Sequence, residues 1–328
     1  MTETMVWRTR AARRVRRSSL AATGLLLVLA AAGRPGAAAP KVVASLKPVH
    51  SLVAGVMAGV GEPYLLVQGG ATPHAYSLRP SAARALSAAD LVVWVGPALE
   101  GFLVKPLDAL AGRARILTLI REPGMTLRAI RLSGLWEHEA HAAAEGEGDA
   151  GARARGAVDP HVWLDPANAR RIVEASAAAL AELDPGNGAA YRANAARLGA
   201  RLDALDAALR ARLAPVKDAP FVVFHDAYQY FERRFALNAV GAFALSPERP
   251  PGVRRLARIR ARILDLGVAC VFAEPQFEPA LVRAVSAGAP VRIAALDPLG
   301  AALAPGPEAY FRLMEALADN LVACLRPG

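Results

Sequence analysis

The chain has 328 residues and a formal net charge of +10 at pH 7. Seven arginines and one glutamate lie within residues 1–39, so the remaining chain holds 32 basic and 28 acidic residues, a net charge of +4. This modest balance removes the main support for a nucleic-acid-binding protein. The roughly 290 remaining residues exceed one ordinary core and predict two domains.

Residues 1–39 have the organisation of a secretory signal peptide. Six arginines precede an apolar stretch, Leu20 to Ala32, and small residues follow at 36–39. The apolar stretch is shorter than the ~20 residues that span a bilayer, which argues against a membrane anchor. No cysteine near the cleavage point could carry a lipid. We therefore expect cleavage near Ala37 to Ala39 and an exported protein without a stable membrane anchor.

After the leader, short apolar runs that predict strands alternate with alanine-rich helical segments. This order indicates βαβ units and mostly parallel sheets. In the first half, the expected strands are 41–46, 64–67 and 90–96, and the expected helices are 51–59, 80–88, 98–110 and 166–183. In the second half, the expected strands are 221–224, 237–243, 268–272 and 291–296, and the expected helices are 227–235, 254–266, 279–287 and 307–325.

Two segments depart from this alternation. Residues 121–160 hold acidic residues among alanines and glycines without periodicity, which predicts a mobile surface loop. Leucines at helical spacing predict one helix over 189–213, about 37 Å long, which would act as a rigid spine between two lobes. The expected organisation is a signal peptide (1–39), an N-terminal lobe (40–185), a linker helix (186–213) and a C-terminal lobe (214–328).

The chain holds two cysteines, Cys270 and Cys324. In an exported protein an even pair predicts a disulfide, and two buried thiols are the alternative. A bridge between them would close a loop of 55 residues, which stabilises a chain by about 4 kcal/mol on the chain-entropy estimate.

Three of the six histidines lie beside short apolar runs: His74 in GGATPHAYSLRPS, His161 in DPHVWLDP and His225 in VVFHDAYQYFE. A neutral imidazole nitrogen binds zinc readily. Separations of 87 and 64 residues exclude a local zinc finger, so the fold must bring these side chains together. His225 and Asp297 directly follow expected strands, where ligands of open α/β sheets bind. The pattern therefore predicts a metal site in a cleft between two lobes.

Five segments resemble the ZnuA-type periplasmic zinc-binding proteins of ABC importers: GGATPHAYSLRPSAARALSAADLVVWVGPALEGFL, HVWLDP, FVVFHDAYQYFERRF, CVFAEPQF and LDPLG. The resemblance covers essentially all of residues 41–326 in order. It implies an α/β fold of two lobes, each with a mostly parallel sheet flanked by helices, joined by one long rigid helix, with the metal site in the interlobe cleft.

The same resemblance implies that His74, His161 and His225 are metal ligands and that Cys270 and Cys324 form a disulfide in the C-terminal lobe. It also implies a function without catalysis. The protein would be a periplasmic monomer that captures Zn²⁺ as its transported ligand. It would deliver the ion to an inner-membrane ABC zinc permease with its cytoplasmic ATPase, and it would have no nucleic-acid partner.

The fourth metal ligand is less strongly indicated. Related manganese receptors place a carboxylate at the position of Asp297, and some zinc members use a glutamate where this chain has Pro73. We expect Asp297 as the fourth ligand, with a water or an open position as the alternative. The acidic loop contains His138 and His141, which are candidates for auxiliary metal binding, and a solvated loop is the alternative.

Two other functions stay open at this point. A manganese- or iron-type receptor of the same family is the nearer alternative, but those receptors carry glutamate where His225 stands, and imidazole suits zinc better. A secreted zinc hydrolase would need three protein ligands, an open position and a carboxylate base, for which Asp226 or Glu274 could be proposed. The chain has no HExxH helix and no serine nucleophile elbow, which disfavours the hydrolase.

Overall fold

Two parallel sheets with the same strand topology carry the fold. The computed structural model describes residues 1–2, 38–131, 157–244, 252–277 and 280–326, and the account below concerns the compact unit from Ala37 onward. The first sheet has the order β2-β1-β3-β4, with β1 Val42–Ala44, β2 Tyr64–Leu65, β3 Leu91–Trp94 and β4 Arg115–Thr118. The second has the order β6-β5-β7-β8, with β5 Phe221–His225, β6 Ala239–Ala244, β7 Cys270–Ala273 and β8 Arg292–Ala295.

Helices connect these strands. The α-helices of the described residues are α1 Lys47–Val56, α2 Pro80–Ala88, α3 Val104–Leu110, α5 Pro166–Leu183, α6 Gly188–Leu213, α7 Gln229–Phe235, α8 Val253–Asp265, α9 Ala280–Ser286 and α10 Ala309–Leu325. Short 3-10 turns are η1 Pro73–Ala75, η2 Gly101–Leu103, η3 Leu119–Arg121, η5 Val162–Leu164, η6 Pro185–Asn187 and η7 Ala214–Val216. None of the helices that the structure describes is long and apolar enough to cross a membrane.

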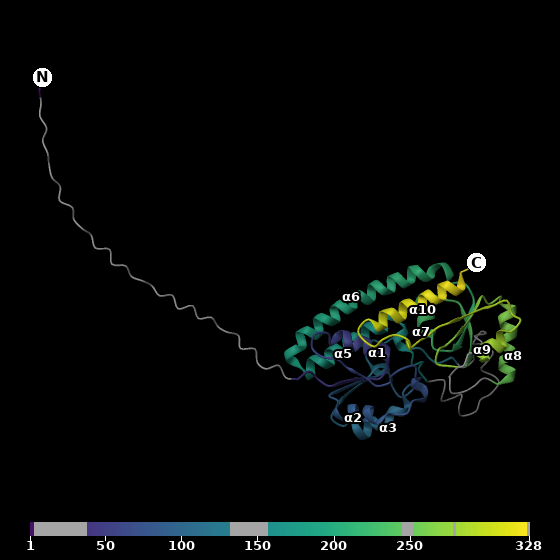
Figure 1. The fold of residues 1–328 in the computed structure, drawn as a ribbon, viewed down its shortest axis with the longest axis horizontal. Helices are drawn as coiled ribbons and strands as arrows, with labels where there is room; N and C mark the ends of the chain where they lie inside the picture. The colour runs from purple at the N-terminus through teal and green to yellow at the C-terminus, as the bar shows by residue number, and fades with distance from the viewer. Residues whose placement is uncertain (3–37, 132–156, 245–251, 278–279, 327–328) are drawn as a thin grey trace. The chain divides into compact units, whose positions relative to one another are not determined.

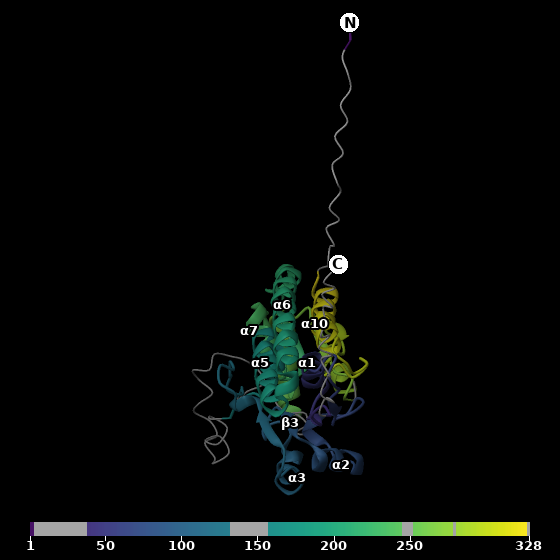
Figure 2. The ribbon, with the colours of Figure 1, turned by 90° about the vertical axis from the view of Figure 1, so that its left-hand side faces the viewer.

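The long helix α6 joins the parts of the chain that form the two sheets. It packs against α5, α1 and α10, and Figures 1 and 2 show it beside α10. Its leucine stripe is buried, as the spacing predicts: Leu198, Leu202, Leu205, Leu209 and Leu213. The fold class predicted from the sequence is therefore confirmed, whereas the exact boundaries at 185/186 and 213/214 stay predictions.

Buried apolar side chains form two clusters. The larger cluster joins the first sheet, the helices around α6 and the face of the second sheet that α10 covers. The smaller one lies between the opposite face of the second sheet and helices α8 and α9, where Val222, Ile259 and Val282 meet. Helices α8 and α9 therefore form an outer layer of the second sheet.

The disulfide predicted from the cysteine count is present. Cys270 in β7 and Cys324 in α10 are bridged, with their Cα atoms 6.1 Å apart. The bond ties the middle of the second sheet to the last helix, 54 residues further along the chain.

The structure corrects the predicted elements in a few places. Strand β4 was not expected; it begins at Arg115, and its first two residues are exposed. Helix α1 begins at Lys47 rather than at 51, since Pro48 is accepted in a first helical turn. The predicted helix over 98–110 shortens to α3, preceded by the turn η2. In the 121–160 loop, an antiparallel bridge joins Ala129 to Val158.

Candidate metal centre

Three separate segments of the chain present the three histidines. His74 follows β2 in the turn η1, where its backbone N–H donates to Thr72 Oγ1 at 3.3 Å. His161 is the residue before η5, and its backbone N–H donates to Asp159 Oδ1 at 3.0 Å. His225 is the last residue of β5, which is one of the two central strands of the second sheet. A turn that follows β2, the residue before η5 and the end of β5 thus meet at one place.

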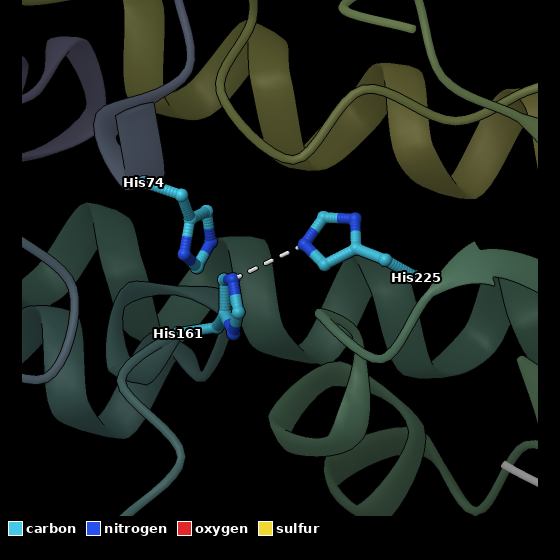
Figure 3. A group of neighbouring side chains, drawn as sticks. All are labelled: His74, His161 and His225. Atoms are coloured by element: carbon cyan, nitrogen blue, oxygen red, sulfur yellow. Dashed lines mark hydrogen bonds between the residues drawn. The ribbon is translucent and has the colours of Figure 1, made fainter. Parts of the chain in front are cut away.

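The three rings face one another (Figure 3). One possible ligand atom from each of His74, His161 and His225 lies within 4.8 Å of the other two. The Nε2 atoms of His161 and His225 are 3.4 Å apart. Two nitrogens at 2.0–2.1 Å from a tetrahedral zinc ion would lie about 3.3 Å apart, so this separation matches zinc coordination.

Two buried carboxylates hold the rings of His161 and His225. His161 Nδ1 lies 2.8 Å from Asp159 Oδ1, and His225 Nδ1 lies 2.6 Å from Glu274 Oε1. An Nδ1–H that donates to a carboxylate leaves Nε2 with a lone pair, which is the tautomer that a metal ligand needs. The two Nε2 atoms that approach each other are therefore the ones prepared to bind an ion.

Burial and neighbouring charges together shift the pKa values of the three imidazoles. Burial, and then the neighbouring His161 and His225, lowers the pKa of His74 to about 2. Burial and His225 likewise lower the pKa of His161 well below its usual value. Burial alone would lower the pKa of His225, but the carboxylates of Glu274, Asp226 and Asp159 together outweigh it, so this pKa lies above the usual value. His225 is therefore the imidazole of the three that carries a proton most readily.

A buried ion network lies beside His225. Arg131 donates to Asp226 Oδ1 at 2.8 Å and to Glu232 Oε2 at 2.5 Å. Burial raises the pKa of Asp226 to about 6 and that of Glu232 to about 7, although Arg131 lowers both. The network thus connects Arg131 to Asp226 and Glu232, which follow His225 in the chain.

Asp297, the predicted fourth ligand, is not brought into the group. Within the residues that the structure describes, the histidine group contains no carboxylate. Instead, Asp297 Oδ1 accepts from the Gln276 side chain at 2.7 Å and from two backbone N–H groups of its own loop, while Oδ2 accepts a third. Asp297 thus caps the loop that follows β8.

That loop is also held from the first sheet's side. Lys47 Nζ donates to the carbonyl oxygens of Gly300 and Ala301, and Trp163 Nε1 donates to the carbonyl of Pro298 at 2.8 Å. The loop and the three histidines line a cavity of about 10 Å³. A volume of this size holds one water molecule or one ion.

Sequence reasoning missed the orienting roles of Asp159 and Glu274. Asp159 stands two residues before His161 in DPHVWLDP, and this spacing could have indicated it. Glu274 lies 49 residues from His225, so only the pairing of β5 with β7 brings the two together. The candidate auxiliary ligands His138 and His141 lie outside the described residues, as does nearly all of the predicted leader.

Comparisons with known proteins point in one direction. The family model described as zinc-uptake complex component A, periplasmic, matches residues 42–324. The high-affinity zinc uptake system protein ZnuA of Brucella abortus (strain 2308) is 44% identical over 304 residues, covering 87% of this chain and 91% of its own. The protein of that name from Paracoccus denitrificans (strain Pd 1222) is 37% identical over 327 residues, covering 95% and 99%. A crystal structure of ZnuA, 25% identical, matches with a TM-score of 0.71 over 88% of this chain and 100% of its own.

Proposed function

The chain belongs to the ZnuA family, and we propose from this membership that it is a periplasmic receptor that binds Zn²⁺ and delivers it to an inner-membrane ABC permease. The ion is the cargo of such a receptor, and the role is non-enzymatic. The leader predicted at 1–39 supports export, with cleavage near Ala37 to Ala39. We further propose that the receptor is a monomer and that the permease works with a cytoplasmic ATPase.

The observation that carries the proposal is the convergence of His74, His161 and His225 on one small cavity. Three imidazoles form a borderline-soft donor set that suits zinc, whereas manganese is better served by carboxylate and water oxygens. The carboxylates nearest to the ring nitrogens, Asp159 and Glu274, bind Nδ1 atoms and support the imidazoles. This arrangement favours zinc over the manganese- or iron-type alternative.

For the fourth position we propose a water molecule in place of Asp297. The Asp297 oxygens already accept four hydrogen bonds, and releasing one would uncap its loop. Three histidines and a water are also the layout of a zinc hydrolase, which needs a free carboxylate base. Asp226 is paired with Arg131 and Glu274 with His225, so both candidate bases are engaged in other contacts. This supports cargo binding.

Calorimetric titration of the metal-stripped protein with Zn²⁺, Mn²⁺ and Cu²⁺ tests the metal. We expect one zinc per chain and much weaker binding of manganese. Cu²⁺ has a higher intrinsic affinity than Zn²⁺ for nitrogen ligands, so it should bind at least as tightly in vitro. Tight binding of manganese with weak binding of zinc would contradict the proposal. Receptor-dependent growth in zinc-poor medium that persists after the ABC zinc permease is deleted would contradict delivery.

A further inference from the structure

Helix α8 has apolar side chains on two separate faces. Its inward face packs on the second sheet through Leu256, Ile259 and Ile263. Its outward face presents a second stripe, at spacings of four, four and three residues, that is exposed along its whole length: Val253, Ala257, Ala261 and Leu264. Val253 is 84% exposed and Leu264 50%. A surface helix is ordinarily polar on its outward face, so this exposed apolar stripe indicates a surface that binds another molecule.

Arginines stand on both sides of the outward stripe. At 100° per residue, Arg254 and Arg258 lie along one side of it and Arg260 along the other. None of these three forms an ion pair with a carboxylate of the described residues, and Arg260 donates to the Val285 carbonyl at 3.4 Å. Helix α9, which packs beside α8 (Figure 1), adds the exposed Arg283.

This concentration of charge is costly for the isolated protein. Arg254 and Arg258 are four residues apart on one helix, a spacing at which like charges repel. Burial and then Arg258 lower the pKa of Arg255, which shows the same repulsion. No acidic residue stands in the first turn, so the arginines there face the positive end of the helix dipole. An anionic partner relieves all of these costs.

On the other arginine-rich helices, several arginines have acidic partners. On α6, Arg201 pairs with Glu308 and Arg212 pairs with Asp319, both on or next to α10. On α8 the one acidic residue is Asp265, at its last position. Arg254, Arg258 and Arg260 of α8 therefore differ from these paired arginines of α6.

The combination of stripe and arginines selects the partner. An acidic protein surface or free phosphate would satisfy the arginines but would leave the apolar stripe in water. A helix with an apolar stripe between arginines is typical of helices that lie in a membrane interface. Guanidinium groups bind phosphate oxygens in a bidentate fashion, while the apolar side chains enter the boundary between headgroups and acyl chains.

We propose that the outward face of α8, together with Arg283 of α9, binds anionic phospholipid headgroups and holds the protein reversibly at a membrane surface. This association goes beyond metal capture and does not depend on which metal is carried. It requires no covalent anchor, because several arginines near an anionic surface each contribute to binding.

Vesicle flotation tests the proposal with protein purified from the periplasm, so that the leader has been removed by the cell. We expect binding to vesicles of phosphatidylcholine mixed with phosphatidylglycerol, weakening as salt is raised, and no binding to phosphatidylcholine alone. Combining Arg254→Glu, Arg258→Glu and Arg260→Glu should lower the partition coefficient at least about a hundredfold. The matched control combines Arg84→Glu, Arg113→Glu and Arg192→Glu, exposed arginines elsewhere with the same charge change, and should retain most of the binding.

A second pair of variants separates insertion from charge attraction. Val253→Ser with Leu264→Ser should weaken binding several-fold without changing the charge, whereas Leu110→Ser with Leu183→Ser should not. If the triple arginine variant of α8 and its matched arginine control lost vesicle binding equally, net charge alone would explain the binding, and the proposal would be overturned. So would a failure of the unsubstituted protein to bind the anionic vesicles. Retained zinc binding in each variant shows that the fold is intact.

Discussion

The Nε2 atoms of His161 and His225 lie 3.4 Å apart, although 64 residues separate the two histidines in the chain. His161 precedes the turn η5, and His225 ends strand β5. At this distance the two nitrogens cannot both carry a proton without strong repulsion. They can share one proton, or both can bind a metal ion. The predictions below follow from this pair and from the groups that hold it.

Substitution of a ligand should matter more than substitution of Asp297. His225→Ala removes one of three imidazoles, and we expect it to weaken zinc binding by more than the 10–100-fold that loss of an orienting residue costs. Asp297→Ala should weaken it less than about tenfold, since the carboxylate caps its own loop. Calorimetric titration of both variants checks this. The reverse order would indicate a carboxylate-dominated site.

Zinc binding should depend on pH through one proton. His74 and His161 have lowered pKa values and stay neutral, whereas the pKa of His225 is raised by Glu274 against the effect of burial. Affinity should therefore be full above the pKa of His225 and fall as the pH drops through it, with about one proton displaced per zinc. Titrations in buffers of different ionisation enthalpy count the protons. Release of two or more would contradict the assignment.

Loss of the charge on Glu274 tests its orienting role. Glu274→Gln keeps the size of the side chain but removes the charge that raises the pKa of His225. We expect zinc affinity to fall 10–100-fold at high pH. The pH at which affinity begins to fall should move to lower values, because the imidazole then loses its proton more easily. A purely structural role would leave that pH unchanged.

The buried arginine should be important for stability. Arg131→Met leaves Asp226 and Glu232 buried without their partner, and we expect the free energy of unfolding to fall by about 3–5 kcal/mol at pH 8. Both carboxyls have raised pKa values, about 6 and about 7, so the folded state binds their protons more readily than the unfolded state. The loss of unfolding free energy in the variant should therefore become smaller as the pH falls through these values, because the buried carboxyls become protonated and neutral. Urea unfolding at pH 8 and pH 5 measures it.

Reduction of the disulfide should destabilise the protein without removing the metal centre. The Cys270–Cys324 bridge closes a long loop, and its loss should cost about 4 kcal/mol. The double substitution Cys270→Ala with Cys324→Ala should show a lower midpoint of urea unfolding. Its zinc affinity in the absence of urea should stay close to that of the unsubstituted protein. An unchanged midpoint would argue against the stabilising role.

The fold could be predicted from the sequence mainly because strands and helices differ in composition here. Apolar runs such as LVVW form β3, and proline marks the start of α2 at the predicted residue. Strand β4 escaped prediction because it is the edge strand of its sheet, where the charged Arg115 can remain exposed to solvent. The pairing of β4 with β3 is a tertiary interaction that no local pattern indicates.

The candidate site shows the same limit. The positions of His74, His161 and His225 after apolar runs indicated a shared cleft. Whether Asp297 would point into that cleft could not be derived, because its direction depends on three backbone N–H groups in the loop that it caps. A carboxylate at a strand end can bind a metal or its own loop, and only the loop's conformation decides between them.

The cavity between the histidines has a kinetic consequence. Its volume of about 10 Å³ corresponds to one water molecule or one ion, and the three histidines line it. An entering cation must exchange its water molecules for imidazole nitrogens on the way in, so the rate of loading should follow how quickly each metal sheds water. Mg²⁺ dehydrates reluctantly and prefers oxygen ligands, so we expect it to load slowly and to bind weakly here.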